Sequence, residues 1–313
     1  MFMGKSINYL NPKVSIIIPT YNRPHLAGRA IKSVLNQTHQ NFEIILVDDS
    51  PNNDTKEVVK QLKDERIKYI KSEDIKRGSA AARKRNLGIR NISQDSKYIA
   101  FLDDDDEFLP TFLEETLKKL EQENEVVAVG VYGESRLEDG RKLKRRYPLR
   151  EFWETRLGNG SVLRREIFEK ENIWFDEKTL FEDLDFGVRV AKNHKVGFIP
   201  KILRVYYIYP SKKGESSSTK YERQADNLGY FFKKNQDIYF AAGKRAFGFL
   251  NFLAGKIYCQ AGRIREGRFH FKKALKTDFK LKYFLYYLIA LFFPKVFQSH
   301  RILILKYKIL GNL

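Results

Sequence analysis

The stretch that most constrains the fold is residues 98–110, an apolar run followed by four consecutive aspartates. Residues 98–102 are too few for a helix and rich in β-forming side chains, which predicts a strand buried on both faces. Four carboxylates at the end of such a strand repel one another unless a cation lies among them. A hard divalent cation with oxygen ligands would satisfy them. The alternative is an acidic turn that caps a helix expected over 110–121.

The basic composition has two interpretations. It indicates an anionic partner, or the positive charge only keeps the protein soluble. The 313 residues carry a formal net charge of +19, which fits nucleic acid, an anionic membrane surface or a phosphorylated substrate. The single cysteine, Cys259, excludes a disulfide framework and a cysteine zinc cluster. Five scattered histidines argue against a histidine metal site. The sequence begins without an apolar signal region, and no run reaches the roughly 18 apolar residues of a spanning helix, so we expect a cytoplasmic chain.

Strand and helix patterns alternate along the first 210 residues. We expect strands over 14–19, 42–47, 67–70, 98–102 and 126–132, and helices over 25–37, 55–63, 80–90 and 110–121. This alternation predicts an α/β fold with a mainly parallel sheet flanked by helices on both faces. Ligands of such sheets bind beyond the carboxyl ends of the strands. Polar clusters follow three of the expected strands, at 20–22, 48–49 and 103–106, and their convergence predicts a site there.

The rest of the chain changes character near residue 220. Residues 159–165 predict a turn into a strand or short helix, 185–192 an amphipathic helix, and 196–199 and 203–209 two strands. From 221 onward the pattern is helical with no strand signal. We therefore expect two parts, an α/β domain over 1–220 and an α-helical C-terminal extension over 221–313.

Five motifs, taken in order, resemble family 2 glycosyltransferases of the GT-A fold. They are VSIIIPTYNR (14–23), FEIILVDDS (42–50), RKRNLGI (83–89), FLDDDDEFLP (101–110) and FEDLDF (181–186). The resemblance covers about the first 210 residues and makes 1–220 the catalytic domain. It implies transfer of a sugar from a nucleotide-sugar donor with inversion at the anomeric carbon, using Mg²⁺ or Mn²⁺.

The resemblance places the nucleoside near the first two motifs. Pro19, Thr20 and Tyr21 match the loop that holds the nucleoside, with Tyr21 near the base, and Arg23 closes the same motif. Asp49 matches the acid that receives the N–H of a uracil-type base, which suits UDP or dTDP. The alternative for Asp49 is a helix N-cap.

The third motif implies residues that line the donor. Arg85 and Asn86 match the family's Arg-Asn pair. Arg83 is an alternative to Arg85, and a solvated arginine is the other interpretation.

The aspartate run matches the family's D-x-D pair. Asp105 is the expected metal ligand, Asp103 is expected at the ribose or the metal, and Asp104 fills the variable position. Family members often carry a histidine later in the chain that helps to bind metal or phosphate. Here Tyr209 stands at that position, which leaves the third metal ligand open.

The last motif implies the acceptor side. Asp183 matches the catalytic base, the one carboxylate that removes the acceptor proton during an inverting transfer. Glu182 is expected to orient Asp183 or the acceptor. The alternative is that 182–185 is only an acidic helix start. We expect the acceptor, a glycan or a lipid-linked molecule, to contact 159–165 and Glu182. The basic run 141–146 faces an anionic acceptor or is a solvated loop.

The end of the chain suggests contact with a membrane. Residues 281–293 are apolar apart from Lys282, and basic residues flank them. We expect 280–310 to hold the protein peripherally at the inner face of the cell membrane. The alternative is a helix that closes the core or forms a dimer contact.

Competing functions come from other classes. A nucleic-acid-binding protein would explain the charge, but the four acids at the strand end would repel phosphate unless a metal is bound, so we expect no nucleic acid partner. A non-catalytic nucleotide-sugar binder would not need Asp183 and the D-x-D pair. A nucleotidyltransferase would not need the Glu-Asp motif.

Overall fold

The computed structural model describes residues 11–72, 80–143, 155–209 and 217–297. The strands are β1 (Lys13–Thr20), β2 (Phe42–Asp48), β3 (Ile67–Lys71), β4 (Ser96–Phe101), β5 (Glu107–Phe108), β6 (Val126–Leu137), β7 (Lys142–Leu143), β8 (Ser161–Arg164) and β9 (Lys195–Ile208). The helices are α1 (Pro24–Leu35), α2 (Asp54–Leu62), α3 (Ala80–Ile89), α4 (Phe112–Gln122), α5 (Glu166–Glu169), α6 (Glu182–Asn193), α7 (Ser217–Ala241), α8 (Lys244–Gln260), α9 (Ile264–Thr277) and α10 (Leu281–Phe292).

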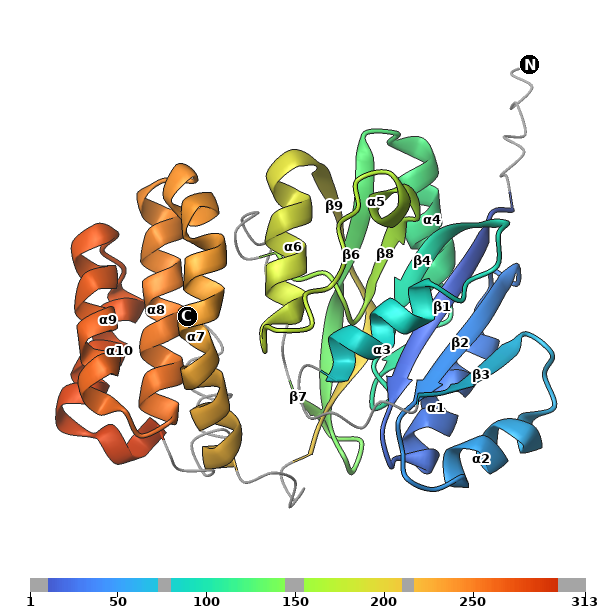
Figure 1. The fold of residues 1–313 in the computed structure, drawn as a ribbon, viewed down its shortest axis with the longest axis horizontal. Coiled ribbons are helices and arrows are strands. Elements are labelled where there is room, and N and C mark those ends of the chain that lie inside the picture. The colour runs from blue at the N-terminus through green and yellow to red at the C-terminus, as the bar shows by residue number, and fades with distance from the viewer. Residues whose placement is uncertain (1–10, 73–79, 144–154, 210–216, 298–313) are drawn as a thin grey trace.

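The strands form one mixed sheet in the order β3-β2-β1-β4-β8-β6-β9-β5, with β7 paired to β6 (Figure 1). The α/β class predicted from the sequence is confirmed, and β1 to β4 are parallel as expected. Strand β8 departs from the parallel arrangement because it runs antiparallel to both β4 and β6.

The two strands predicted at 196–199 and 203–209 are wrong as separate elements, since they form the single strand β9. Strand β9 pairs with β6 along its length, and Val131 faces Ile199 while Tyr132 faces Ile202. Pro200 and Lys201 therefore bulge out of the ladder. Proline has no N–H to donate, so a bulge is the place in a strand that tolerates it.

The strand order reverses at β1 and β4, and we call the region beyond the carboxyl ends of these two strands the crevice. The chain passes from β1 outward to β2 and β3, then returns to β4 on the other side of β1. Ile17 of β1 is the register partner of Phe101 of β4, so the loops that follow these two strands start side by side. Open α/β sheets bind ligands at such a switch point.

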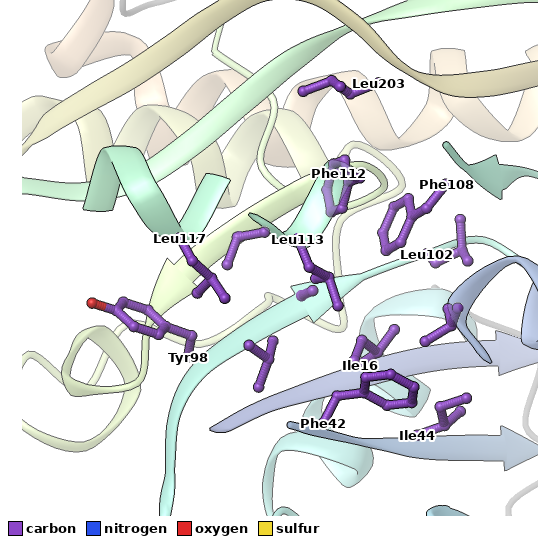
Figure 2. Close-up of a cluster of buried hydrophobic side chains, with 14 of the residues drawn as sticks. Ile16, Phe42, Ile44, Tyr98, Leu102, Phe108, Phe112, Leu113, Leu117 and Leu203 are labelled. Atoms are coloured by element: carbon purple, nitrogen blue, oxygen red, sulfur yellow. The ribbon is translucent and has the colours of Figure 1, made fainter. Parts of the chain in front are cut away.

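Each face of the sheet has its own core. Helices α1, α2 and α4 cover one face, where Ile16, Ile44 and Leu113 belong to a single apolar cluster (Figure 2). Helices α3, α5 and α6 cover the other face, where Ile17 packs in a cluster with Phe186 of α6. Strands buried on both faces explain why their sequences read as continuous apolar runs.

Helix α6 is apolar on two faces and joins the sheet to the helical extension. Its Phe186 and Val190 face the sheet, while Leu184 and Val188 pack in a cluster formed with α7 and α8. Helices α9 and α10 form a further cluster against α8, farther from the sheet (Figure 1). Within the described ranges, no helix is both long enough and apolar enough to cross a bilayer.

Helix α10 is apolar apart from Lys282, but only one side of it is covered. Tyr283, Tyr286 and Ala290 are buried against α8 and α9. Leu281 and Phe292 are 59% and 69% exposed. The expectation of a helix closing the core therefore fits one side of α10, and a second apolar surface remains in solvent. Residues 298–310 of the segment expected at the membrane lie outside the described residues.

Candidate active site

The four aspartates after β4 divide into two buried and two partly exposed side chains. Asp104 accepts a hydrogen bond from the Thr20 hydroxyl at 2.8 Å and pairs with Arg23 at 3.0 Å. Asp106 is fully buried and accepts the backbone N–H of Tyr207 at 3.1 Å. Burial raises the pKa of Asp104 to about 6 and that of Asp106 to about 7, with Arg23 opposing the rise at Asp104. These two acids hold the loop against its neighbours.

Asp103 and Asp105, the two acids of the D-x-D pair, are the partly exposed ones. Their side chains are 35% and 26% exposed. An Asp103 oxygen lies 2.7 Å from Arg85 Nη2, and an Asp105 oxygen lies 2.9 Å from Arg23 Nη1. The backbone N–H of Asp103 donates to Asn159 Oδ1 at 3.1 Å, which fixes the start of the loop.

This pair fits a cation that is held partly by a substrate. In the described part of the chain, no group of three or more His, Cys, Asp or Glu side chains is placed to hold a metal ion. Mg²⁺ and Mn²⁺ accept one or two carboxylates and take further oxygen ligands from water and phosphate. Tyr209, at the position where the family often has histidine, lies beside the acids, with its hydroxyl 3.4 Å from the Asp105 carbonyl oxygen.

The loops after β1 and β2 meet at a lysine that the sequence did not single out. Lys84 Nζ lies 2.6 Å from Asp49 Oδ1 and donates to the Thr20 carbonyl at 2.9 Å. The same nitrogen lies 5.9 Å from the centre of the Tyr21 ring, which is half-exposed. Pro19 lies in β1 beside Val47 of β2. A buried cation thus ties the loops after β1 and β2 together under an open aromatic ring.

Arg85 links the acids that follow β4 to the acids of α6. Its side chain is buried, with Nη2 at 2.7 Å from Asp103 and Nη1 at 3.2 Å from Glu182 Oε1. The guanidinium also lies 5.4 Å from the centre of the Phe175 ring. Arg85, rather than Arg83, is the arginine bonded to these two acids.

Asn86 points away from the crevice. Its amide donates to the Phe175 carbonyl and to Glu177 Oε1, both at 2.9 Å, and its oxygen accepts the Phe175 N–H at 3.2 Å. These bonds fix the segment that leads into α6. Asn86, expected to line the donor, therefore supports the segment that leads to Glu182 and Asp183 and does not bond Asp103 or Asp105.

Helix α6 begins at Glu182, so both acids of the Glu-Asp motif lie in its first turn. The helix was expected to begin only at 185. Asp183 lies 2.7 Å from Arg156 Nη1 and accepts the Leu184 N–H at 2.7 Å. Burial raises the pKa of Glu182. Burial would also raise the pKa of Asp183, but Arg156 and Arg85 hold it below its ordinary value. Asp183 is therefore ionised at neutral pH.

A cavity of about 560 Å³ connects the two sets of acids. Asp103, Asn159 and Asp183 all line it, together with the turn at 158–160. Gly160 has a φ of +76°, and a side chain there would lie 2.4 Å from Arg204 Cδ. The predicted acceptor turn over 159–165 thus reaches the crevice. In the basic run, Arg141 pairs with Asp139 at 2.7 Å and Lys142 with Glu134 at 3.1 Å, and 144–146 lie outside the described residues.

Two contributors to the site were missed in the sequence, Lys84 and Arg156. Lys84 stands next to Arg85 in the RKRN motif, which was the available signal. Asn159 was noted only within the expected acceptor turn. Arg156 follows an irregular basic stretch and carries no periodic signal, so its contact with Asp183 is visible only in three dimensions.

Fold and crevice together define a glycosyltransferase of the GT-A type. The structure is similar to a mannosyltransferase of Pyrobaculum calidifontis solved with GDP-Man and Mn²⁺, with a TM-score of 0.60, 15% identity, and coverage of 97% of this chain and 87% of that one. It is also similar to S. aureus TarS 1–349 in complex with UDP-GlcNAc, with a TM-score of 0.53, 16% identity, and coverage of 93% and 82%. At these identities the likeness shows the fold.

Residues 15–195 match the model of the family described as "Glycosyl transferase family 2", and the chain belongs to this family. It is therefore an enzyme of the glycosyltransferase class. The match includes every residue of the crevice named above except those of β9 beyond 195 and Tyr209. The resemblance inferred from five sequence motifs is confirmed.

The curated relatives are similar over part of their length. An uncharacterized glycosyltransferase of Rickettsia conorii is 50% identical over 113 residues, which are 36% of this chain and 18% of that protein. The GalNAc(5)-diNAcBac-PP-undecaprenol beta-1,3-glucosyltransferase of Campylobacter jejuni is 42% identical over 110 residues, 34% of either chain. A UDP-Glc:alpha-D-GlcNAc-diphosphoundecaprenol beta-1,3-glucosyltransferase of Escherichia coli is 37% identical over 119 residues, 38% of this chain and 45% of that one. The chain spans less than half the length of each of these relatives.

Proposed function

We propose that the protein transfers a sugar, with inversion and with a divalent cation, from a UDP-sugar to a glycan or lipid-linked acceptor at a membrane surface. The observation that carries this proposal is the bridge from Arg85 to Asp103 on one side and to Glu182 on the other. Asp183 follows Glu182 directly. One buried side chain therefore connects the donor acids with the proposed base.

Asp183 supplies what an inverting transfer needs on the acceptor side. An ionised carboxylate must lie near the acceptor hydroxyl and remove its proton as the oxygen attacks the anomeric carbon. The lowered pKa keeps Asp183 ionised, and its contact with Arg156 fixes its direction. Glu182 positions this turn through Arg85.

The donor would lie across the crevice between β1 and β4. Thr20 and Tyr21 border the nucleoside end, with Asp49 and Lys84 beneath them. Asp105 and Asp103 would hold Mg²⁺ or Mn²⁺ at the diphosphate end. When bound, the cation stabilises the negative charge that develops on the leaving nucleoside diphosphate. Arg23, bonded to Asp104 and Asp105, adds positive charge at this end.

Two observations support an acceptor at a membrane. The Campylobacter and Escherichia relatives are named for acceptors linked to undecaprenol through a diphosphate. Helix α10 exposes Leu281, Phe284 and Phe292, a surface that an interface between lipid and water would cover. Lys280, Lys282 and Lys295 flank this surface, and each lysine near anionic head groups adds about 1 kcal/mol of binding free energy.

A thermal-shift measurement tests the donor assignment. UDP or a UDP-sugar should raise the melting temperature only when Mg²⁺ or Mn²⁺ is present, because the acids at Asp103 and Asp105 otherwise repel the diphosphate. GDP and dTDP serve as matched controls for the base. Equal stabilisation by UDP in EDTA would contradict the metal assignment.

A further inference from the structure

Arg29, in the second turn of α1, contacts the backbone of the aspartate run. Its Nη2 donates to the Asp105 carbonyl oxygen at 2.7 Å. The backbone N–H of Asp106 donates to the Asp103 carbonyl oxygen at 3.1 Å, so residues 103–106 form a turn. The bond that closes this turn uses the Asp103 carbonyl, and the Asp105 carbonyl is held from outside the turn. Arg29 therefore fixes the peptide plane that follows Asp105.

Three side chains from β5 and from the end of β9 hold the Arg29 guanidinium in place. Its Nε lies 3.0 Å from Glu107 Oε1. Its central carbon lies 3.9 Å from the centre of the Tyr207 ring, and its Nη2 also donates to the Tyr209 hydroxyl at 2.8 Å. The Tyr207 hydroxyl donates to Glu107 Oε1 at 3.0 Å, which connects two of these side chains. Glu107 thus balances the charge of Arg29, while Nη2 binds two neutral oxygens.

We propose that Arg29 is a positioning residue of the cation site, because it fixes the backbone at Asp105 before the cation binds. This inference rests on the proposed function, in which Asp103 and Asp105 hold Mg²⁺ or Mn²⁺. The backbone of Asp103 has an anchor of its own, since its N–H donates to Asn159 Oδ1 at 3.1 Å. With both backbones anchored, the fold rather than the cation sets where the two carboxylates lie. Such pre-organisation lowers the cost of binding and makes the site selective.

A fixed pair of carboxylates discriminates between cations by size and geometry. Mg²⁺ needs near-octahedral coordination with oxygens at about 2.0–2.1 Å, whereas Ca²⁺ accepts variable coordination at about 2.3–2.6 Å. A mobile Asp105 would therefore weaken the binding of Mg²⁺ more than that of Ca²⁺. Only a planar guanidinium can contact an acid, a ring and two oxygens at once, so lysine should not replace Arg29.

UDP binding with one cation at a time tests this role without depending on sugar transfer. Titration calorimetry on the full chain gives the Kd of UDP at saturating Mg²⁺ and at saturating Ca²⁺. The Kd in Ca²⁺ divided by the Kd in Mg²⁺ measures the cation selectivity. Arg29→Lys and Arg29→Gln should each lower this ratio at least about five-fold, mainly because the Kd in Mg²⁺ rises. A general weakening of the fold would raise both Kd values together and leave the ratio unchanged.

Arg66→Lys is the matched control. The Arg66 guanidinium also lies over a ring, 4.3 Å from the centre of Phe42, and it also pairs with an acid, Asp64, at 2.7 Å. Arg66 directly precedes β3, so it lies at the end of the parallel strands opposite to the crevice. Its replacement should leave the selectivity ratio within about two-fold of wild type.

Tyr209→Phe separates Arg29 from its neighbour. This change removes one of the three groups that hold Arg29 and leaves the bond from Arg29 to Asp105 in place. The ratio should therefore stay closer to wild type than to Arg29→Lys. A fall as large as in Arg29→Lys would mean that the Tyr209 hydroxyl sets the selectivity, and would overturn the proposal. An unchanged ratio in both Arg29 variants, or a wild type that binds UDP equally well with Ca²⁺ and Mg²⁺, would also overturn it.

Failure of the proposed function gives a different pattern. If neither Mg²⁺ nor Mn²⁺ allows wild type to bind UDP, the donor proposal fails and the role of Arg29 fails with it. If wild type binds UDP with Mg²⁺ and both Arg29 variants keep the wild-type ratio, the role of Arg29 fails alone and the donor proposal stands.

Discussion

Replacing Asp183 with asparagine should separate chemistry from folding and donor binding. The amide oxygen can still accept the Leu184 N–H and the Arg156 guanidinium, each now at 2.7 Å from the carboxylate. Arg156 is 36% exposed, so water compensates much of the lost ion pair, and the free energy of unfolding should fall by no more than about 1 kcal/mol. The amide cannot take the acceptor proton.

The expected loss is therefore one of turnover. Removing a general base costs roughly 10²- to 10⁴-fold in rate, or about 3 to 5 kcal/mol of transition-state stabilisation. The affinity for UDP with Mn²⁺ should stay within a few-fold of wild type, because the donor acids contact Arg85 and Arg23, not Asp183.

Initial rates at saturating donor, together with calorimetric UDP binding, measure both quantities. Asp176→Asn is the matched control: it makes the same carboxylate-to-amide change at an acid paired with Lys234, outside the crevice, and should keep near-wild-type turnover. Turnover within ten-fold of wild type in Asp183→Asn would refute the assignment of Asp183 as the base.

Three further outcomes follow from particular contacts. Arg85→Lys keeps one charge but cannot bond both Asp103 and Glu182, so kcat/KM should fall about 10- to 100-fold and the free energy of unfolding by about 1–3 kcal/mol; near-wild-type values for both would show that the bridge is dispensable. The wild-type protein should float with anionic liposomes, and Phe284→Ser/Phe292→Ser should reduce the floated fraction several-fold. The control Phe240→Ser, at an exposed phenylalanine of α7, should leave the floated fraction unchanged. Wild-type protein that stays folded and does not float would contradict membrane contact. Burial, aided by Lys273, lowers the pKa of His270 to about 4 in the folded protein. The histidine pKa in the unfolded chain is about 6.5, so the unfolded chain binds more protons between these two pH values. The free energy of unfolding should therefore fall by about 1–2 kcal/mol as pH drops from 6.5 toward 4. Urea titrations at pH 7 and pH 5 measure this change, and an equal pH effect in His270→Gln would assign it to other groups.

The flotation test uses point substitutions for a structural reason. Cutting the chain after Thr277 would remove Tyr283 and Tyr286 from the cluster with α8 and α9. Such a truncation would expose a core surface and create a new apolar patch. Phe284 and Phe292 face solvent, so replacing them changes the surface and leaves the cluster in place.

The strands of the α/β part were predictable because each lies between two apolar layers. Residues 14–19 and 42–47 are apolar except at Ser15 and Glu43, and the structure buries all of them except Glu43, which is partly buried. The sequence predicted two strands, over 196–199 and 203–209, and the gap between them contains Pro200, which lacks an N–H. Whether a proline ends a strand or only bulges it depends on the partner strand, and β6 continues past the bulge.

The aspartate run shows what residue spacing alone can predict about a site. The D-x-D pattern singled out Asp103 and Asp105, and the structure leaves these two partly exposed while Asp104 and Asp106 are buried. What holds the buried pair was not predictable. Asp104 depends on Thr20, and Asp106 depends on Tyr207, 101 residues away in the chain.

Helix α3 illustrates a limit of motif reasoning. Successive residues of a helix point about 100° apart. Lys84 therefore reaches toward Asp49 and β2, while Arg85 reaches toward Asp103 and α6. The motif identified the helix. Only the position of β1 between β2 and β4 shows that the side chains of Lys84 and Arg85 both reach the same crevice.

The surroundings of Asp183 were the least predictable part because two separate segments build them. The sequence divides near 220 into an α/β pattern and a helical pattern, and each has its own apolar periodicity. A second cavity beside Asp183, of about 420 Å³, takes its acids from the first part and its lysines from the second. No local pattern relates Lys220 to Glu182; their proximity follows from Leu184 and Val188 of α6 packing against α7 and α8. If acceptors approach Asp183 from this side, the helical extension determines which of them reach it, while the sheet determines which donor is used.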